Sequence, residues 1–109
     1  MGWQDGTITI PKGEKESAPV DLDQGQTPVL KHLVIFGPDV LPEMVTVATA
    51  ERHGDDSRYY PLNDGNGLAH EILGQAANEL VLVSPSLKLV ASMPAGEDRV
   101  FRILGRSSK

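Results

Sequence analysis

TITIP, residues 7–11, is the stretch that decides the fold class. Threonine and isoleucine alternate through it, so Ile8 and Ile10 fall on one face of an extended chain and the threonines fall on the other. Pro11 then ends the segment, because proline cannot donate a hydrogen bond to a central strand ladder. This pattern predicts a short strand with one side buried and the other in solvent.

Segments of the same kind recur along the chain, separated by turns rich in Gly, Pro, Asn and Asp. The further predicted strands lie at residues 18–23, 29–36, 44–51, 58–62, 68–73, 79–83, 87–93 and 99–104. We expect Val20 and Leu22 to point inward, and Val45, Val47 and Thr49 to share one side. Short strands at regular spacing predict an all-β protein, a single antiparallel β-sandwich of eight or nine strands in a jelly-roll-like or immunoglobulin-like order.

Residues 29–36 form the most apolar of the early segments. The run LVIF, residues 33–36, is continuously hydrophobic, which predicts that both faces of the strand are covered. His32 alternates with Leu30 and Val34, so we expect its side chain to be half-buried.

Residues 69–80 also allow a helical interpretation. Ile72, Ala76 and Leu80 recur at four-residue spacing, as on one side of a helix. Gly74 and the flanking turn residues favour strands with, at most, a short helical turn.

The bulk composition sets limits on the class of protein. A chain of 109 residues is typical of one domain, and we expect a single domain over residues 1–109 with its core at about 6–104 and short flexible ends. The net charge of −5 argues against nucleic acid as a partner. Arg99, Arg102 and Arg106 are interpreted as a solvated strand face rather than a phosphate site.

The residue inventory also bears on location. The chain has no cysteine, which excludes disulfides and thiolate metal sites and fits assembly in a reducing cytoplasm. Its first residues are neither basic nor apolar, so no signal peptide is expected. No apolar run approaches the roughly 18 residues that cross a bilayer, so we expect no membrane partner.

The sequence NDGNG, residues 63–67, is the strongest turn signal of the chain. Asn, Asp and Gly tolerate the positive φ that hairpin turns require. A calcium loop would instead present side-chain oxygens at alternate positions, and Gly65 and Gly67 interrupt that alternation. We therefore predict a bend between two strands and no metal site.

Other chemistry-bearing residues do not form a recognisable catalytic pattern. His32, His53 and His70 show no HxH or HxxxH spacing. The acid pair at residues 55–56 lies in a predicted exposed turn, and Ser-Pro-Ser at residues 84–86 lacks a glycine-flanked nucleophile elbow. The sequence predicts no enzyme activity and no cofactor.

Aromatic residues beside the NDGNG turn are the best candidates for partner contacts. Adjacent Tyr59 and Tyr60 should point to opposite faces, one into the core and one outward. Trp3 lies near the start of the chain and could dock into its own domain or a neighbouring subunit. The candidate partner-binding residues are therefore Trp3, Tyr59, Tyr60, Asn63, Asp64 and Asn66.

The order of strands and turns resembles a family of small bacteriophage structural proteins with jelly-roll-like β-sandwich domains. The resemblance covers about residues 6–104 and follows the segments TITIP, PVDL, LVIF, GPDVLPEMVTVATA, RYYPLNDGNG, LVLVSPSLKLVASM and RVFRIL. It rests on this order more than on any invariant motif. The last loop, PAGED at residues 94–98, is shorter than the family tends to have, so contacts made by a longer loop would be missing.

The resemblance implies a virion component made in many copies in the host cytoplasm. It implies a capsid decoration protein that stabilises the shell through protein–protein interfaces, with the major capsid protein or other head or tail components as partners and with homo-oligomers expected. Contact segments would be residues 1–6, 12–17 and 105–109. A head–tail, tail fibre or adaptor component stays open as an alternative, as does a carbohydrate-binding module that uses the tyrosines. A metal-dependent cupin would need converging histidines.

Overall fold

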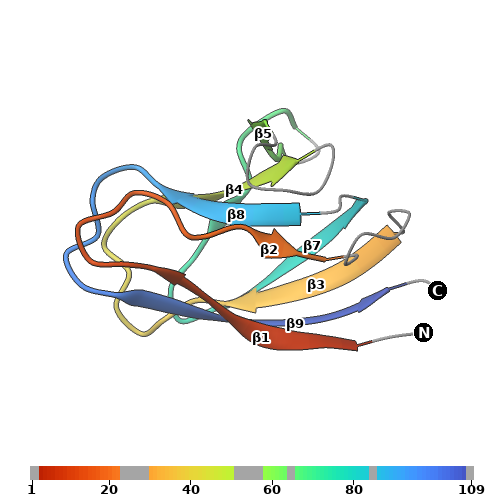
Figure 1. Ribbon diagram of the computed structural model, residues 1–109, viewed down its shortest axis with the longest axis horizontal. Helices are drawn as coiled ribbons and strands as arrows, with labels where there is room; N and C mark the ends of the chain where they lie inside the picture. Colours follow the sequence, from red (N-terminus) through yellow and green to blue (C-terminus); the bar gives the residue numbers. More distant parts are fainter. Residues whose placement is uncertain (1–2, 23–29, 51–57, 64–65, 84–85, 108–109) are drawn as a thin grey trace.

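The computed structural model describes residues 3–22, 30–50, 58–63, 66–83 and 86–107, and within these ranges the only regular structure is β-strand (Figure 1). The described strands are β1 (Trp3–Ile10), β2 (Val20–Asp21), β3 (Leu30–Phe36), β4 (Val45–Ala50), β5 (Tyr59–Pro61), β6 (Glu71–Ile72), β7 (Ala77–Val83), β8 (Ser86–Ala91) and β9 (Arg99–Ser107). The predicted all-β class is confirmed. No helix of these ranges is long and apolar enough to cross a membrane.

The strands form two antiparallel sheets that stack as a sandwich (Figure 1). One sheet has the order β1-β9-β3-β7, and the other has the order β2-β8-β4-β5 with β6 also paired to β4. From β1 to β4, and again from β7 to β9, each connection crosses to the other sheet. An immunoglobulin sandwich keeps its first two strands in the same sheet, whereas the crossing of every connection from β1 to β4 and from β7 to β9 is that of a jelly roll. The strand order thus decides between the two predicted arrangements.

The predicted hairpin at NDGNG differs in detail from the observed one. β5 pairs with Ala48–Ala50 of β4 and β6 pairs with Val45–Thr46, so both strands follow the same side of β4. Residues 62–70 connect these two strands and are called the excursion here. An antiparallel bridge between Asn63 and Ala69 joins its two ends. The bend is confirmed, but the returning strand is much shorter than predicted because only Glu71–Ile72 meets β4.

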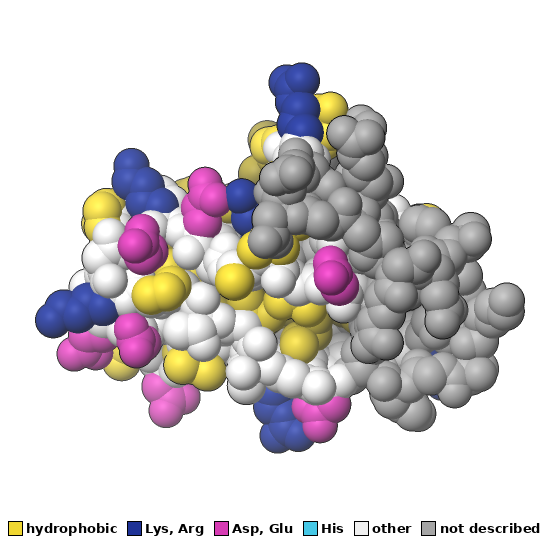
Figure 2. All heavy atoms as spheres, viewed as in Figure 1, with side chains coloured by type: hydrophobic (Ala, Val, Ile, Leu, Met, Phe, Trp, Pro, Cys, Tyr) yellow, Lys and Arg dark blue, Asp and Glu magenta, His cyan; other side chains and the backbone are white. Residues whose placement is uncertain are grey.

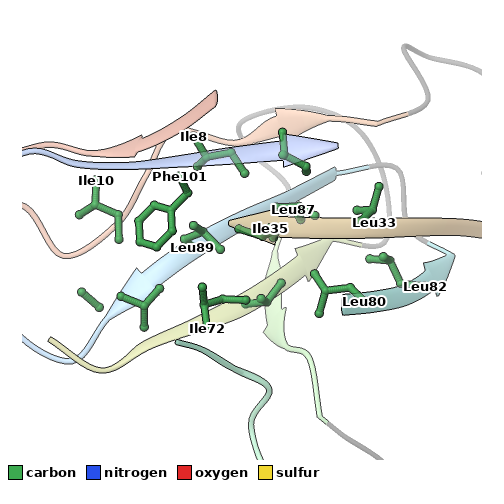
Figure 3. Close-up of a cluster of buried hydrophobic side chains, with 14 of the residues drawn as sticks. Ile8, Ile10, Leu33, Ile35, Ile72, Leu80, Leu82, Leu87, Leu89 and Phe101 are labelled. Atoms are coloured by element: carbon green, nitrogen blue, oxygen red, sulfur yellow. The ribbon is translucent and has the colours of Figure 1, made fainter. Parts of the chain in front are cut away.

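The core lies between the two sheets, and its side chains come from alternate positions of both (Figure 3). Ile8 and Ile10 share one face and Val45 and Val47 share one side, as predicted, and all four side chains are 2% exposed or less. Leu22 is also buried, whereas Val20 and Thr49 are only half-buried. Figure 3 shows Phe101 among these side chains, between Ile10 and Leu89. Each fully buried side chain of this size contributes roughly 1.5–3 kcal/mol of transfer free energy.

The predicted two-sided burial of the LVIF run is wrong. Leu33 and Ile35 are fully buried, but Val34 is only half-buried and Phe36 is 38% exposed. The helical alternative for residues 69–80 is also wrong, since that segment holds β6 and the first residues of β7. His32 shares the outward direction of Val34, and its side chain is 57% exposed rather than half-buried.

A buried ion pair closes one end of the core. Arg99, at the start of β9, donates from Nε to Oε1 of Glu43 at 2.9 Å and from Nη2 to Oε2 at 3.1 Å. Both side chains are at most 8% exposed, so the interpretation of Arg99 as part of a solvated face is wrong; Arg102 and Arg106 are exposed as expected. The bond from Arg99 lowers the pKa of Glu43, and the same bond raises the pKa of Arg99.

Candidate docking surface

The outward side of the four-stranded sheet carries a set of apolar side chains. The register places Leu30 opposite Val83, and Val34 between Leu104 and Glu79. Because these residues occupy the positions that alternate with the core residues, they point away from the second sheet. We call the following set the open face: Leu30, Val34, Phe36, Val81, Val83, Val100 and Leu104.

Most of the open face is accessible to a partner. Leu30 is 49% exposed, Val81 58%, Val83 60% and Val100 50%. Single exposed hydrophobic residues are normal on a protein surface, whereas apolar residues gathered on the same side of three neighbouring strands indicate an interaction site, even with His32, Glu79 and Arg102 among them. The open face thus differs from a scatter of isolated side chains.

Two pairs of oppositely charged side chains lie on the outward side of the same sheet. Nε2 of His32 lies 2.6 Å from Oε2 of Glu79, and Nε of Arg102 lies 3.7 Å from Oδ1 of Asp5. All four side chains are more than half exposed, so each pair contributes little to stability. Basic side chains also lie among acidic ones on the face drawn in Figure 2. The face drawn there does not offer the basic stripe that phosphate binding requires.

The two tyrosines point to opposite sides, as expected, but neither is buried in the core. Tyr59 lies opposite Ala50 and is half-buried, with Nζ of Lys88 4.6 Å from its ring centroid. Tyr60 is 39% exposed, and the guanidinium carbon of Arg58 lies 5.1 Å from its ring centroid. Strand alternation separates the rings, so they do not form one stacking platform.

The structure describes only some of the remaining candidate contact residues. Asn63 and Asn66 are exposed on the excursion between β5 and β6, whereas Asp64 lies outside the described residues. Trp3 begins β1 opposite Arg106, and its side chain is likewise outside the description. The hydroxyl of Tyr59 is buried, and no hydrogen-bond partner for it lies in the described ranges.

Among the described residues, no group of three His, Asp or Glu side chains is placed to hold a metal ion. His32 instead meets a single carboxylate, that of Glu79, and the backbone N–H of His70 donates to the carbonyl of Leu62 at 2.8 Å. His53 and the acid pair at residues 55–56 lie outside the description, as do residues 84–85 of the Ser-Pro-Ser segment.

Sequence reasoning did not identify the open face, although a signal was present. LVIF at residues 33–36 and LVLV at residues 80–83 are apolar at both even and odd positions. In a sandwich with two sheets, only one side of each strand can face the other sheet. The second apolar side must therefore be exposed or covered by something other than the second sheet.

No protein-family model matches this chain, and no curated protein is significantly similar to it.

Proposed function

We propose that this protein is a bacteriophage virion structural protein that decorates and stabilises a capsid by binding through its open face. The open face is the observation that carries the proposal, because it offers a mainly apolar surface beside which His32 and Arg102 each lie close to a carboxylate. The jelly-roll order supports it further, since this architecture is common in capsid domains. A fold alone does not assign a function, so the binding surface carries more weight.

Binding of this kind would work through area and copy number. A stable interface buries about 800 Å² on each partner, so the contact would include the open face and the residues around it. Each protein would then hold neighbouring subunits of the shell together, and many copies would multiply the gain. Because the open face is mainly apolar, its affinity should depend only weakly on salt.

The partner is the major capsid protein in this proposal, and the protein is made in the host cytoplasm before it joins the virion. A head–tail, tail fibre or adaptor role is the main alternative. Copy number separates the two roles, because a decoration protein covers the whole shell in many copies and an adaptor is present in few. Quantitative mass spectrometry of purified particles measures it.

The direct experiment adds the purified protein to particles that lack it. We expect saturable binding by the wild-type protein and at least about tenfold weaker binding by Phe36→Asp, because a carboxylate would be buried in an apolar interface. Leu68→Asp is the matched control, since Leu68 is 66% exposed on the excursion far from the open face in the strand order. Equal binding by both variants, or no binding by the wild type, would overturn the proposal.

A carbohydrate-binding role rests on Tyr60, which is exposed, and on the nearby exposed amide of Asn63. A sugar would have to displace Arg58 from the ring or use its other side. A glycan array tests this role: binding that is lost in Tyr60→Ala would replace the docking proposal.

A further inference from the structure

We propose that two copies of this protein associate by antiparallel pairing of their β7 strands. β7 is the terminal strand of its sheet, so only its β3 side is paired in the described structure. It runs for seven residues without proline, and its register with β3 is continuous from Ala77 opposite Phe36 to Val83 opposite Leu30. A long, regular and apolar edge strand readily accepts another strand.

The hydrogen-bond pattern shows which backbone groups face the edge. The N–H of Gly37 donates to the carbonyl of Ala76 at 3.0 Å, which marks that pair as a hydrogen-bonded rung of the β3–β7 ladder. Rungs alternate in antiparallel sheets, so Asn78, Leu80 and Leu82 also bond toward β3. The residues in between direct their N–H and C=O groups away from β3: Ala77, Glu79, Val81 and Val83.

The side chains of these edge residues suit a close approach. Val81 and Val83 are 58% and 60% exposed, and both belong to the open face. Glu79 is the one charged residue of β7, and it already lies 2.6 Å from His32. The strand therefore lacks the edge lysines and prolines that protect natural sheets from pairing.

The other edge strands of the two sheets are less suited to pairing with a second copy. β2 has two residues and β5 has three, too few for a stable ladder. β1 has eight residues, but its outward side chains include Asp5, Thr7 and Thr9 instead of valines. β7 is thus the edge that combines length, regularity and an apolar outward side.

A second copy is the occupant because β7 complements itself. In a two-fold pairing centred on Leu80, Ala77 faces the partner's Val83 and Glu79 faces the partner's Val81. Each N–H group on the free edge of β7 then meets a C=O group of the partner's β7, and each C=O group meets an N–H group. No glutamate faces a glutamate. The result is one continuous eight-stranded sheet in which the two open faces lie side by side.

This pairing does not depend on the proposed function, although a dimer with two open faces would bind a repeating shell more tightly than a monomer. Sedimentation velocity over micromolar to millimolar concentrations tests it on the purified protein alone. We expect a concentration-dependent dimer, and we expect Val81→Glu to weaken it by at least about tenfold because two like charges would face each other at each of two rungs.

Two matched variants complete the test. Thr7→Glu adds the same charge on β1, opposite Arg102, and should leave the dimer unchanged. Val81→Lys would face the partner's Glu79 and should retain the dimer better than Val81→Glu. A wild-type protein that stays monomeric, or equal losses in Val81→Glu and Thr7→Glu, would overturn the proposal; equal losses in the two Val81 variants would overturn the register.

Amide hydrogen exchange gives a readout that does not depend on any substitution. The N–H groups of Glu79 and Val81 do not bond to β3 in this ladder, so they should exchange fast in the monomer and slowly in the dimer. The N–H of Leu80 should be protected in both states. A dimer in which Glu79 and Val81 exchange as fast as in the monomer would show that another surface is used.

Discussion

Both sides of the β1-β9-β3-β7 sheet carry hydrophobic residues, but these residues are buried on one side and exposed on the other. Ile35 and Phe36 are neighbours in β3, yet Ile35 is fully buried and Phe36 is 38% exposed. The inner side is closed by the second sheet, whereas the outer side has no cover among the described residues. Hydrophobic residues thus stabilise the fold on one side and are available for binding on the other.

The largest expected effect separates these two sides directly. Ile35→Ala should lower the free energy of unfolding by about 2–5 kcal/mol, because it leaves a cavity in a closed core. Phe36→Ala should cost less, about 1–2 kcal/mol in the isolated protein, since 38% of the residue is already exposed to water and no closed cavity is left. Urea unfolding of both variants measures the difference. Equal losses would mean that the outer side is packed as tightly as the inner one.

The next largest loss of stability is expected at Gly37, directly after the end of β3. A methyl group at Gly37 would overlap the backbone carbonyl oxygen of Leu73, and a backbone atom cannot move away without disturbing the turn before β7. We expect Gly37→Ala to destabilise the protein by about 1–3 kcal/mol in thermal or urea unfolding. Gly96→Ala is the control, because its methyl group would lie 3.6 Å from Nη2 of Arg99, an ordinary contact. Similar losses in the two variants would contradict the close approach at Gly37.

The pair of Glu43 and Arg99 predicts how the closed side responds to acid. Because the folded protein holds the pKa of Glu43 below its ordinary value near 4.5, the folded state binds fewer protons than the unfolded state between the two values. The stabilisation is present above pH 4.5 and is lost as the pH falls through the lower, folded-state pKa.

Glu43→Gln should therefore lower the Tm at neutral pH by several degrees, less than Ile35→Ala does, and the difference from wild type should shrink in acid. Thermal unfolding over a pH series measures this difference. A difference that stays constant between neutral and strongly acidic pH would contradict the role of the charged pair.

The smallest effect is expected beside the open face, at His32. His32→Ala removes the contact with Glu79, but both side chains are more than half exposed, so the loss should be about 0–1 kcal/mol. Added salt should reduce it further. Urea unfolding at low and high salt measures it, and a loss as large as that of Ile35→Ala would mean that the outer side contributes to folding.

The sequence predicted the features of the fold that depend only on residues close together in the chain. Ile8 and Ile10 alternate with threonines, and the strand follows from this local period. β1 nevertheless begins at Trp3, four residues before the predicted start, because its pairing with β9 continues to Arg106. Pairing partners are distant in the sequence, so strand ends and strand order are not encoded locally.

Contacts across the fold were missed for the same reason. Arg99 was expected in solvent because it lies close to two other arginines, but Glu43, 56 positions away, holds it in a buried pair. His32 and Glu79 meet across β3 and β7, 47 positions apart. The apolar runs at residues 33–36 and 80–83 indicated a second apolar side. Which side is exposed, however, depends on which side of β3 faces the second sheet.

Hydrogen exchange of the protein bound to its particle tests the docking account most directly. Docking through the open face predicts that residues 30–36, 77–83 and 99–106 become more protected on binding, while the excursion at residues 62–70 does not change. Protection confined to the excursion, with β3, β7 and β9 unchanged, would contradict it.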